Sequence, residues 1–196
     1  FEKESSFPYM DYRDVTKNIF KSRNTNPLNP IYYLGKDEHS NKILEEYKNH
    51  IKKMFVLLGF DDKIASSAVD AVIEIESRIA KVSYSKAQLR EPFDNYHKIS
   101  FEKLKTDYDG LNWEKYFAGL GIESIDSVNV SQPEPLKECM AMMKELPMEK
   151  QRLYLKWSLI NRAATSLGDK IFNQNFDKFV ILSAIFRKNE GKIDKI

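Results

Sequence analysis

Cysteine, glycine and proline are scarce in this chain. Its 196 residues include a single cysteine, Cys139, and only seven glycines and seven prolines. One cysteine cannot form an internal disulfide, which excludes a disulfide-dense secreted module and is compatible with either the cytoplasm or the periplasm. The low content of glycine and proline favours long helices over a β fold rich in turns.

Long apolar runs and an excess of one charge are also missing. No apolar run approaches the roughly 20 residues that span a bilayer, so we expect no membrane-spanning segment. The formal net charge is +2, from 31 lysines and arginines against 29 aspartates and glutamates. This near-neutral balance gives no reason to expect nucleic acid or an anionic membrane as a partner. The first six residues are charged and polar, so we expect no signal peptide here, although a targeting segment could have been removed.

The sequence contains no recognised catalytic or metal-binding motif. Its three histidines are His39, His50 and His97; none is followed by glutamate, and no two are four residues apart. A His-Glu-x-x-His zinc helix, which places two imidazoles one turn apart on the metal, is therefore absent. No glycine-rich phosphate loop and no Gly-x-Ser-x-Gly elbow occurs either. We therefore predict no catalytic residue, no metal ligand and no cofactor for this chain.

The chain is expected to divide into an irregular arm, residues 1–39, and a helical lobe, residues 40–196. Turn and extended signals with proline occur at residues 7–9 and 24–30, with room for a short helix between them. From Ser40 onward, apolar residues recur at steps of three and four, which is typical of amphipathic helices.

Two long helices are predicted between residues 40 and 82. The apolar stripe of the first includes Ile43, Tyr47, Ile51, Met54, Phe55 and Leu58. Gly59 follows as a C-terminal cap residue, and Asp61 or Asp62 can cap the second helix. Because the connection is short, the two helices should form an antiparallel hairpin.

The middle of the lobe is predicted to contain short elements. Ser100 and Asn112 can each cap a short helix. Residues 126–131 alternate, with Val128 and Val130 on one face, and this segment favours a short strand.

The fold class is predicted to be all-α, with about six to eight helices. A helix from about residue 134 to 145 precedes a long helix from Pro147 to Leu167, and a last helix follows. Antiparallel pairs are therefore expected near residues 40–82 and 134–188, with at most a short strand near 126–131.

Several short motifs follow one another in a fixed order between Tyr47 and Trp157. They are Tyr47-x-x-His50-Ile51-x-x-Met54-x-x-Leu57-x-Gly59, Glu76-x-x-Ile79-Ala80, Arg90, Tyr96-His97-Lys98-Ile99-Ser100 with Leu104, Leu111-Asn112-Trp113-x-x-Tyr116-Phe117, Val128-x-Val130-x-x-Pro133-Glu134 and Leu153-Tyr154-Leu155-x-Trp157. In this order and spacing the set resembles the N-terminal peptidase region of the neprilysin and endothelin-converting-enzyme family of zinc metallopeptidases. The family usually has asparagine where His97 stands and an aromatic residue where Pro135 stands, and residues 1–30 match it poorly.

The resemblance implies that this chain is the non-catalytic, helical lobe of a neprilysin-like zinc metalloendopeptidase. In that family a helical lobe closes over a catalytic lobe that carries His-Glu-x-x-His and a glutamate as the third zinc ligand. The enclosed cavity admits peptides and excludes folded proteins, so this chain would supply its wall and lid. Its partners would be peptide substrates and the catalytic lobe of the same parent polypeptide, which holds the zinc.

Two further expectations follow from the resemblance. The chain alone should not cleave peptides. Because the animal ectodomains of the family are rich in disulfides, the single cysteine implies a bacterial member, with a periplasmic or otherwise extracytoplasmic location favoured over the cytoplasm.

Two other functions are compatible with the sequence. The first alternative is a free-standing helical protein-interaction module without catalytic activity. The second is a regulatory or nucleic-acid-binding helical protein, against which the near-neutral charge argues. The resemblance itself assigns no substrate-binding residue to the matched stretch.

Three residues invite a catalytic interpretation, and for each we favour a structural one. His50 lies beside an apolar stripe and is expected to be a partly buried histidine that bonds a neighbouring group. Glu76 lies on an apolar stripe, where a charge needs a partner, so we expect an ion pair with a residue such as Arg90. Cys139 is expected to pack in the core beside three methionines that suggest a docking surface for another lobe.

Overall fold

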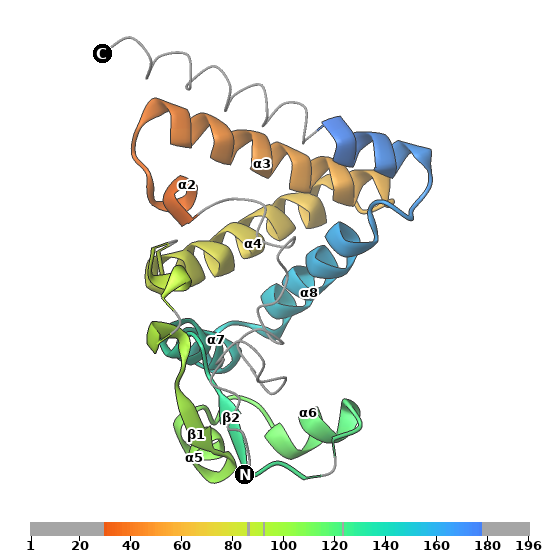
Figure 1. Ribbon diagram of the computed structural model, residues 1–196. Helices are drawn as coiled ribbons and strands as arrows, with labels where there is room; N and C mark the ends of the chain where they lie inside the picture. Colours follow the sequence, from red (N-terminus) through yellow and green to blue (C-terminus); the bar gives the residue numbers. More distant parts are fainter. Residues whose placement is uncertain (1–29, 86, 92, 123, 178–196) are drawn as a thin grey trace, which may run out of the picture. The chain divides into compact units, whose positions relative to one another are not determined.

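The computed structural model describes residues 30–177, apart from residues 86, 92 and 123 (Figure 1). The described residues form two compact units. We call residues 30–80 with 147–177 the hairpin unit, and residues 81–146, which separate its two parts in sequence, the inserted unit. The short helix expected before residue 24 and the end of the last predicted helix lie outside the described residues.

The hairpin unit contains two long helices, α3 (Glu38–Leu57) and α4 (Asp62–Val82), which run in opposite directions (Figure 1). Gly59 in their connection has a φ of 87°, a left-handed conformation that glycine adopts without strain. Asp61 accepts a hydrogen bond from the backbone N–H of Ile64 (2.8 Å) and thereby caps α4. The predicted antiparallel hairpin is therefore confirmed.

Two further helices belong to this unit, α2 (Pro30–Leu34) and α8 (Met148–Ala163), and residues 169–177 are also helical. α8 begins after Pro147, as predicted, but ends earlier than Leu167, because the carbonyl of Ala163 already accepts turn bonds from residues 166 and 167. α2 falls in the stretch that we expected to be an irregular arm. Residues 1–29 lie outside the described part, so the division into arm and lobe stays a prediction.

One hydrophobic cluster fills the hairpin unit. Its buried members are Tyr33, Ile43, Tyr47, Ile51, Met54, Phe55, Ala65, Ala68, Ala71, Val72, Ala80, Leu153, Trp157, Ile160 and Ala164. They come from all four of its named helices and from the turn after α8, so segments separated by more than a hundred residues in sequence share one core.

The inserted unit consists of short elements. In chain order they are the 3₁₀ helices η2 (Gln88–Arg90) and η3 (Phe93–Asn95), then β1 (Lys98–Ser100), α5 (Phe101–Asp107), α6 (Trp113–Gly119), β2 (Ser127–Asn129) and α7 (Pro133–Glu145). Ser100 caps α5 by accepting the N–H of Lys103 (3.2 Å), and Asn112 caps α6 by accepting the N–H of Lys115 (2.8 Å). Both predicted caps are therefore present.

The two strands of the inserted unit pair antiparallel, with Ile99 opposite Val128. β2 lies in the segment where a short strand was predicted, whereas its partner β1 was not predicted, because three residues are too few to show an alternating pattern. A second cluster packs beneath them, with buried Leu104, Tyr108, Trp113, Phe117, Val128, Val130, Leu136 and Met140. The all-α class is thus confirmed, with β1 as an addition to the one short strand that was predicted. No described helix is both long and apolar enough to cross a membrane.

Candidate functional site

The most unusual group in the hairpin unit is a buried carboxylate. Glu76 on α4 is 1% exposed and lies among apolar side chains. Its Oε2 accepts a hydrogen bond from the hydroxyl of Tyr33 on α2 (2.8 Å), and its Oε1 accepts one from the hydroxyl of Tyr47 on α3 (3.1 Å). A buried charge is tolerated only when its oxygens are bonded in this way.

The bonded group extends to α8. The indole Nε1 of Trp157 donates to the hydroxyl of Tyr47 (3.2 Å), so that Tyr47 both donates and accepts. The ring of His50, which is 3% exposed, meets the indole of Trp157 edge to face at 5.7 Å between centroids. We call Tyr33, Tyr47, His50, Glu76 and Trp157 the Glu76 cluster; it joins α2, α3, α4 and α8.

The Glu76 cluster connects helices in the core of the hairpin unit. All five side chains are buried in the hydrophobic core of the hairpin unit, so a substrate has no access to the carboxylate. Glu76 is 1% exposed and His50 3% exposed, and the ion pair and the bonded imidazole expected for them stay predictions. Arg90, the partner suggested from the sequence, is exposed in η2, and two of the donors to Glu76 are the hydroxyls of Tyr33 and Tyr47.

Because of its two tyrosines, the Glu76 cluster is expected to make the free energy of unfolding fall at alkaline pH. Burial and the Glu76 carboxylate raise the pKa of Tyr33 and of Tyr47 above the ordinary value of 10.0. Above pH 10 these tyrosines ionise in the unfolded chain and stay protonated in the folded one. The unfolded state then binds fewer protons, so the free energy of unfolding falls as pH rises.

We expect the two tyrosines to reduce the free energy of unfolding by roughly 1.7 kcal/mol between neutral pH and pH 10.5. Urea unfolding measured at pH 8, 9.5 and 10.5 checks this value. A Tyr33→Phe, Tyr47→Phe variant is the control, because other tyrosines and Cys139 titrate equally in both proteins. Equal pH dependence in the two proteins would contradict the assignment.

Cys139 and His97 take structural positions in the inserted unit. Cys139 is half-buried against the second cluster, and burial and the charge of Glu138 raise the pKa of its thiol to about 12. At neutral pH it is therefore a protonated thiol and a poor nucleophile. The backbone N–H of His97 donates to Oδ1 of Asn129 (2.7 Å), which ties the start of β1 to β2.

The donor groups of the described residues do not fit zinc. A zinc site needs three or four histidine, cysteine or carboxylate ligands that converge on one point. Within the described part of the chain, no three such side chains are grouped closely enough to hold a metal ion. The whole sequence also lacks His-Glu-x-x-His.

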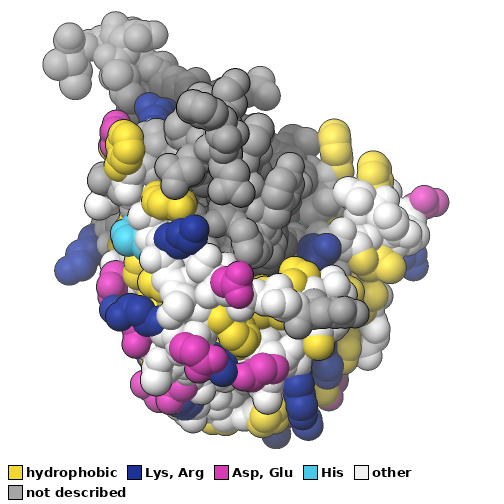
Figure 2. Space-filling view, turned by 60° about the horizontal axis from the view of Figure 1, so that its bottom comes forward, with side chains coloured by type: hydrophobic (Ala, Val, Ile, Leu, Met, Phe, Trp, Pro, Cys, Tyr) yellow, Lys and Arg dark blue, Asp and Glu magenta, His cyan; other side chains and the backbone are white. Residues whose placement is uncertain are grey.

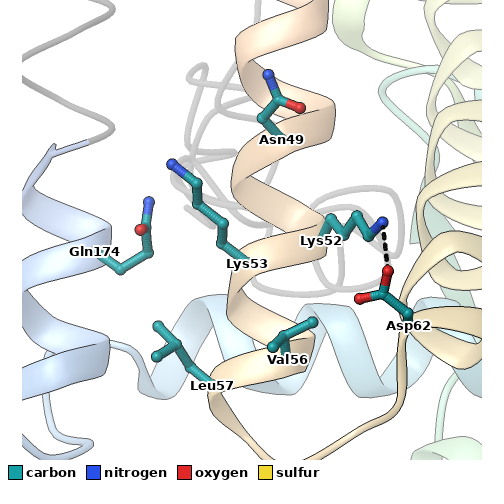
Figure 3. Close-up of a pocket in the computed structure, with 7 residues that line it drawn as sticks. All are labelled: Asn49, Lys52, Lys53, Val56, Leu57, Asp62 and Gln174. Carbon is teal, nitrogen blue, oxygen red and sulfur yellow. Dashed lines mark hydrogen bonds and ion pairs between the residues drawn. The ribbon is translucent and has the colours of Figure 1, made fainter.

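A shallow groove of about 490 Å³ lies on the hairpin unit beside α3 (Figure 3). It is lined by Asn49, Lys52, Lys53, Val56, Leu57, Asp62 and Gln174. Figure 3 shows Lys53 and Gln174 pointing toward each other across the groove, whereas Lys52 turns to Asp62 (3.1 Å). These seven residues include no histidine, cysteine or serine, so the described lining of the groove has no pairing of nucleophile and base.

Charges of both signs are mixed on the face of the molecule shown in Figure 2. On the face in Figure 2, the described basic and acidic side chains are interspersed with hydrophobic ones. A nucleic-acid interface needs lysines and arginines gathered on one side. The described side chains on this face are therefore not gathered into a basic patch.

A comparison with protein families identifies the family of this chain. The N-terminal model of Peptidase family M13 matches residues 5–189, which is nearly the entire chain. The chain belongs to peptidase family M13. The neprilysin-family resemblance drawn from the motifs is thereby confirmed.

Named M13 relatives are distant in sequence. Endothelin-converting enzyme 1 of Cavia porcellus is 25% identical over 154 residues, which are 76% of this chain and 20% of that protein. Neprilysin-3 of Drosophila melanogaster is 25% identical over 156 residues, again 20% of its length. The chain thus spans about a fifth of the length of these M13 proteins.

Solved structures show the same fold. The zinc metalloprotease Zmp1 of Mycobacterium tuberculosis in its open state matches with a TM-score of 0.71 at 22% identity, over 78% of this chain and 24% of that one. The inhibitor complex of the same protein gives 0.71 at 23% identity. This chain and Zmp1 therefore share a helical fold although fewer than a quarter of their aligned residues are identical.

Sequence reasoning missed the tyrosines of the Glu76 cluster as partners of the carboxylate. Tyr47 was placed in an apolar stripe and in a family motif, without a role toward Glu76, and Tyr33 lay in the predicted arm. The signal in the sequence was a charged residue, Glu76, on the apolar face of a predicted helix. A buried glutamate needs hydrogen-bond donors, and tyrosine hydroxyls on neighbouring helices can supply them.

Proposed function

We propose that this chain is the non-catalytic helical lobe of an M13 zinc metalloendopeptidase. The observation that carries the proposal is the family match over residues 5–189 in a sequence that has no His-Glu-x-x-His. The likeness in fold to Zmp1, a protein described as a zinc metalloprotease, supports it. In this proposal the zinc and its ligands belong to a catalytic lobe of the same parent polypeptide.

The role of the lobe is to enclose the active-site cavity and to restrict substrates to peptides. A wall that restricts size must keep its shape when substrate presses on it. The Glu76 cluster supports this role, because it holds four helices of the hairpin unit through buried hydrogen bonds. The lobe therefore contributes shape and exclusion, and the parent contributes the chemistry of peptide-bond hydrolysis.

The test compares two purified proteins, this 196-residue chain and the polypeptide encoded by the complete reading frame that contains it. A short quenched-fluorescent peptide is the substrate. We expect cleavage by the complete polypeptide alone, its loss on treatment with a chelator, and its recovery with zinc. The same peptide sequence within a rigid loop of a folded protein should remain uncut.

Two outcomes would overturn the proposal. The first is zinc-dependent cleavage by the chain alone. The second is a complete reading frame that encodes no zinc motif, which would favour the alternative, a free-standing helical protein-interaction module without catalytic activity.

A further inference from the structure

Helix α8 has two apolar faces. One face is buried in the hairpin unit and carries Leu153, Trp157 and Ile160. At 100° per residue, Met148, Leu155 and Leu159 fall within about 40° of one another on the opposite side of the helix. An ordinary surface helix has one apolar stripe and one polar face, so a second stripe needs an explanation.

The second stripe is strongly exposed. Met148 is 61% exposed, Leu155 66% and Leu159 69%. A single exposed leucine is normal on a protein surface. Three large apolar side chains aligned along one helix face form an exposed apolar stripe, and apolar surface of this kind is typical of an interaction site.

Two arginines flank this stripe, one on each side. Arg152 and Arg162 are exposed, and neither forms an ion pair with any described residue. They are ten residues apart, which places them about 15 Å apart along the helix axis. Lys156, on the same side as Arg152, lies over the ring of Phe60 at 5.2 Å from its centroid. The charges beside the stripe are therefore predominantly positive.

We propose that the exposed face of α8 is the docking surface for an acidic amphipathic segment of the parent polypeptide outside residues 1–196. The segment presents aliphatic side chains to Met148, Leu155 and Leu159, and carboxylates to Arg152 and Arg162. Planar guanidinium groups bind carboxylates in a bidentate manner, so these arginines set the register of the segment. This inference rests on the proposed function, because the matched 154 residues are only 20% of endothelin-converting enzyme 1, which makes that relative about four times as long as this chain.

Met148 provides a natural probe of the docked state. Its thioether is oxidised by hydroxyl radicals or peroxide when it is exposed and is protected when it is covered. The rate of oxidation is measured by mass spectrometry in the 196-residue chain and in the complete polypeptide. Because oxidation requires the segment to open, we expect it to be at least about tenfold slower in the complete polypeptide.

Charge variants of the complete polypeptide test the chemistry of the partner. Arg152→Glu with Arg162→Glu should return the oxidation rate of Met148 to that of the isolated chain. Lys63→Glu with Lys170→Glu is the matched control, since it makes the same change of charge at two exposed positions away from the stripe. That control should leave Met148 protected. Unchanged circular dichroism and melting confirm that each variant is folded.

Four results would overturn the inference. Equal oxidation of Met148 in both proteins would show that nothing covers it. Protection that survives the arginine variants would exclude an acidic partner. Protection of the isolated chain that grows with its concentration would identify a second copy, and protection that requires added peptide would identify substrate.

Failure of the docking surface and failure of the proposed function give different results. A complete polypeptide that cleaves peptides and leaves Met148 exposed rejects the docking surface alone. A complete polypeptide that protects Met148 and never cleaves rejects the proposed function alone.

Discussion

Replacing Glu76 with alanine is expected to lower the free energy of unfolding of the hairpin unit by about 4 kcal/mol. The change removes the acceptor of two buried tyrosine hydroxyls and leaves a cavity between α2, α3 and α4. Unpaired buried donors cost about 1–3 kcal/mol each. The measurement is urea unfolding followed by the fluorescence of Trp157, whose indole is bonded to Tyr47.

Glu74→Ala is the matched control, because it makes the same substitution two residues earlier on the same helix. The carboxylate of Glu74 is partly exposed and pairs with Lys150 at the surface, so its loss should cost at most about 1 kcal/mol. A double-mutant cycle between Glu76→Ala and Tyr47→Phe should give a coupling energy of about 1–2 kcal/mol. Equal effects of the two glutamate variants would show that the buried carboxylate has no special role.

Gly110→Ala is expected to destabilise the inserted unit by about 2 to 3 kcal/mol. A Cβ at this position would lie 2.8 Å from both the Cα and the carbonyl oxygen of Met140 on α7. Those atoms are backbone, so they cannot move aside as a flexible side chain can, and the turn after α5 must separate from α7. The fluorescence of Trp113, whose indole donates to the carbonyl of Tyr108 (2.7 Å), reports this unit.

Gly119→Ala provides the comparison within the same unit. A Cβ there meets no atom within 4 Å, and alanine is the better helix former. We therefore expect no loss of stability, and a gain of up to about 1 kcal/mol. If both variants unfold at the same urea concentration as the parent chain, close packing of Gly110 on Met140 does not limit stability.

The hairpin of α3 and α4 was predictable because several local signals agree. An apolar stripe, a left-handed glycine at residue 59 and an aspartate cap at residue 61 all indicate the same turn. The pairing of β1 with β2 was not predictable to the same degree. Each strand has only three residues, and their register depends on contacts made across the inserted unit.

The functional inference depended on a pattern of motifs rather than on a site. Periodicity alone indicates a helical lobe, and the ordered set from Tyr47 to Trp157 identifies its family. The partners of Glu76 escaped prediction because hydrogen bonds between helices depend on the tertiary fold, which spacing along one helix does not specify. The second apolar face of α8 also escaped notice, since Leu155 was counted only within a family motif.

The bond between Tyr47 and Trp157 joins residues 110 positions apart. During synthesis, α3 and α4 leave the ribosome long before α8, and the inserted unit must be made in between. Until Trp157 emerges, the side of the hairpin that packs against α8 remains exposed to water. Folding of the hairpin unit is consequently a late, long-range event in the life of the nascent chain, governed by the slow closure of a large loop.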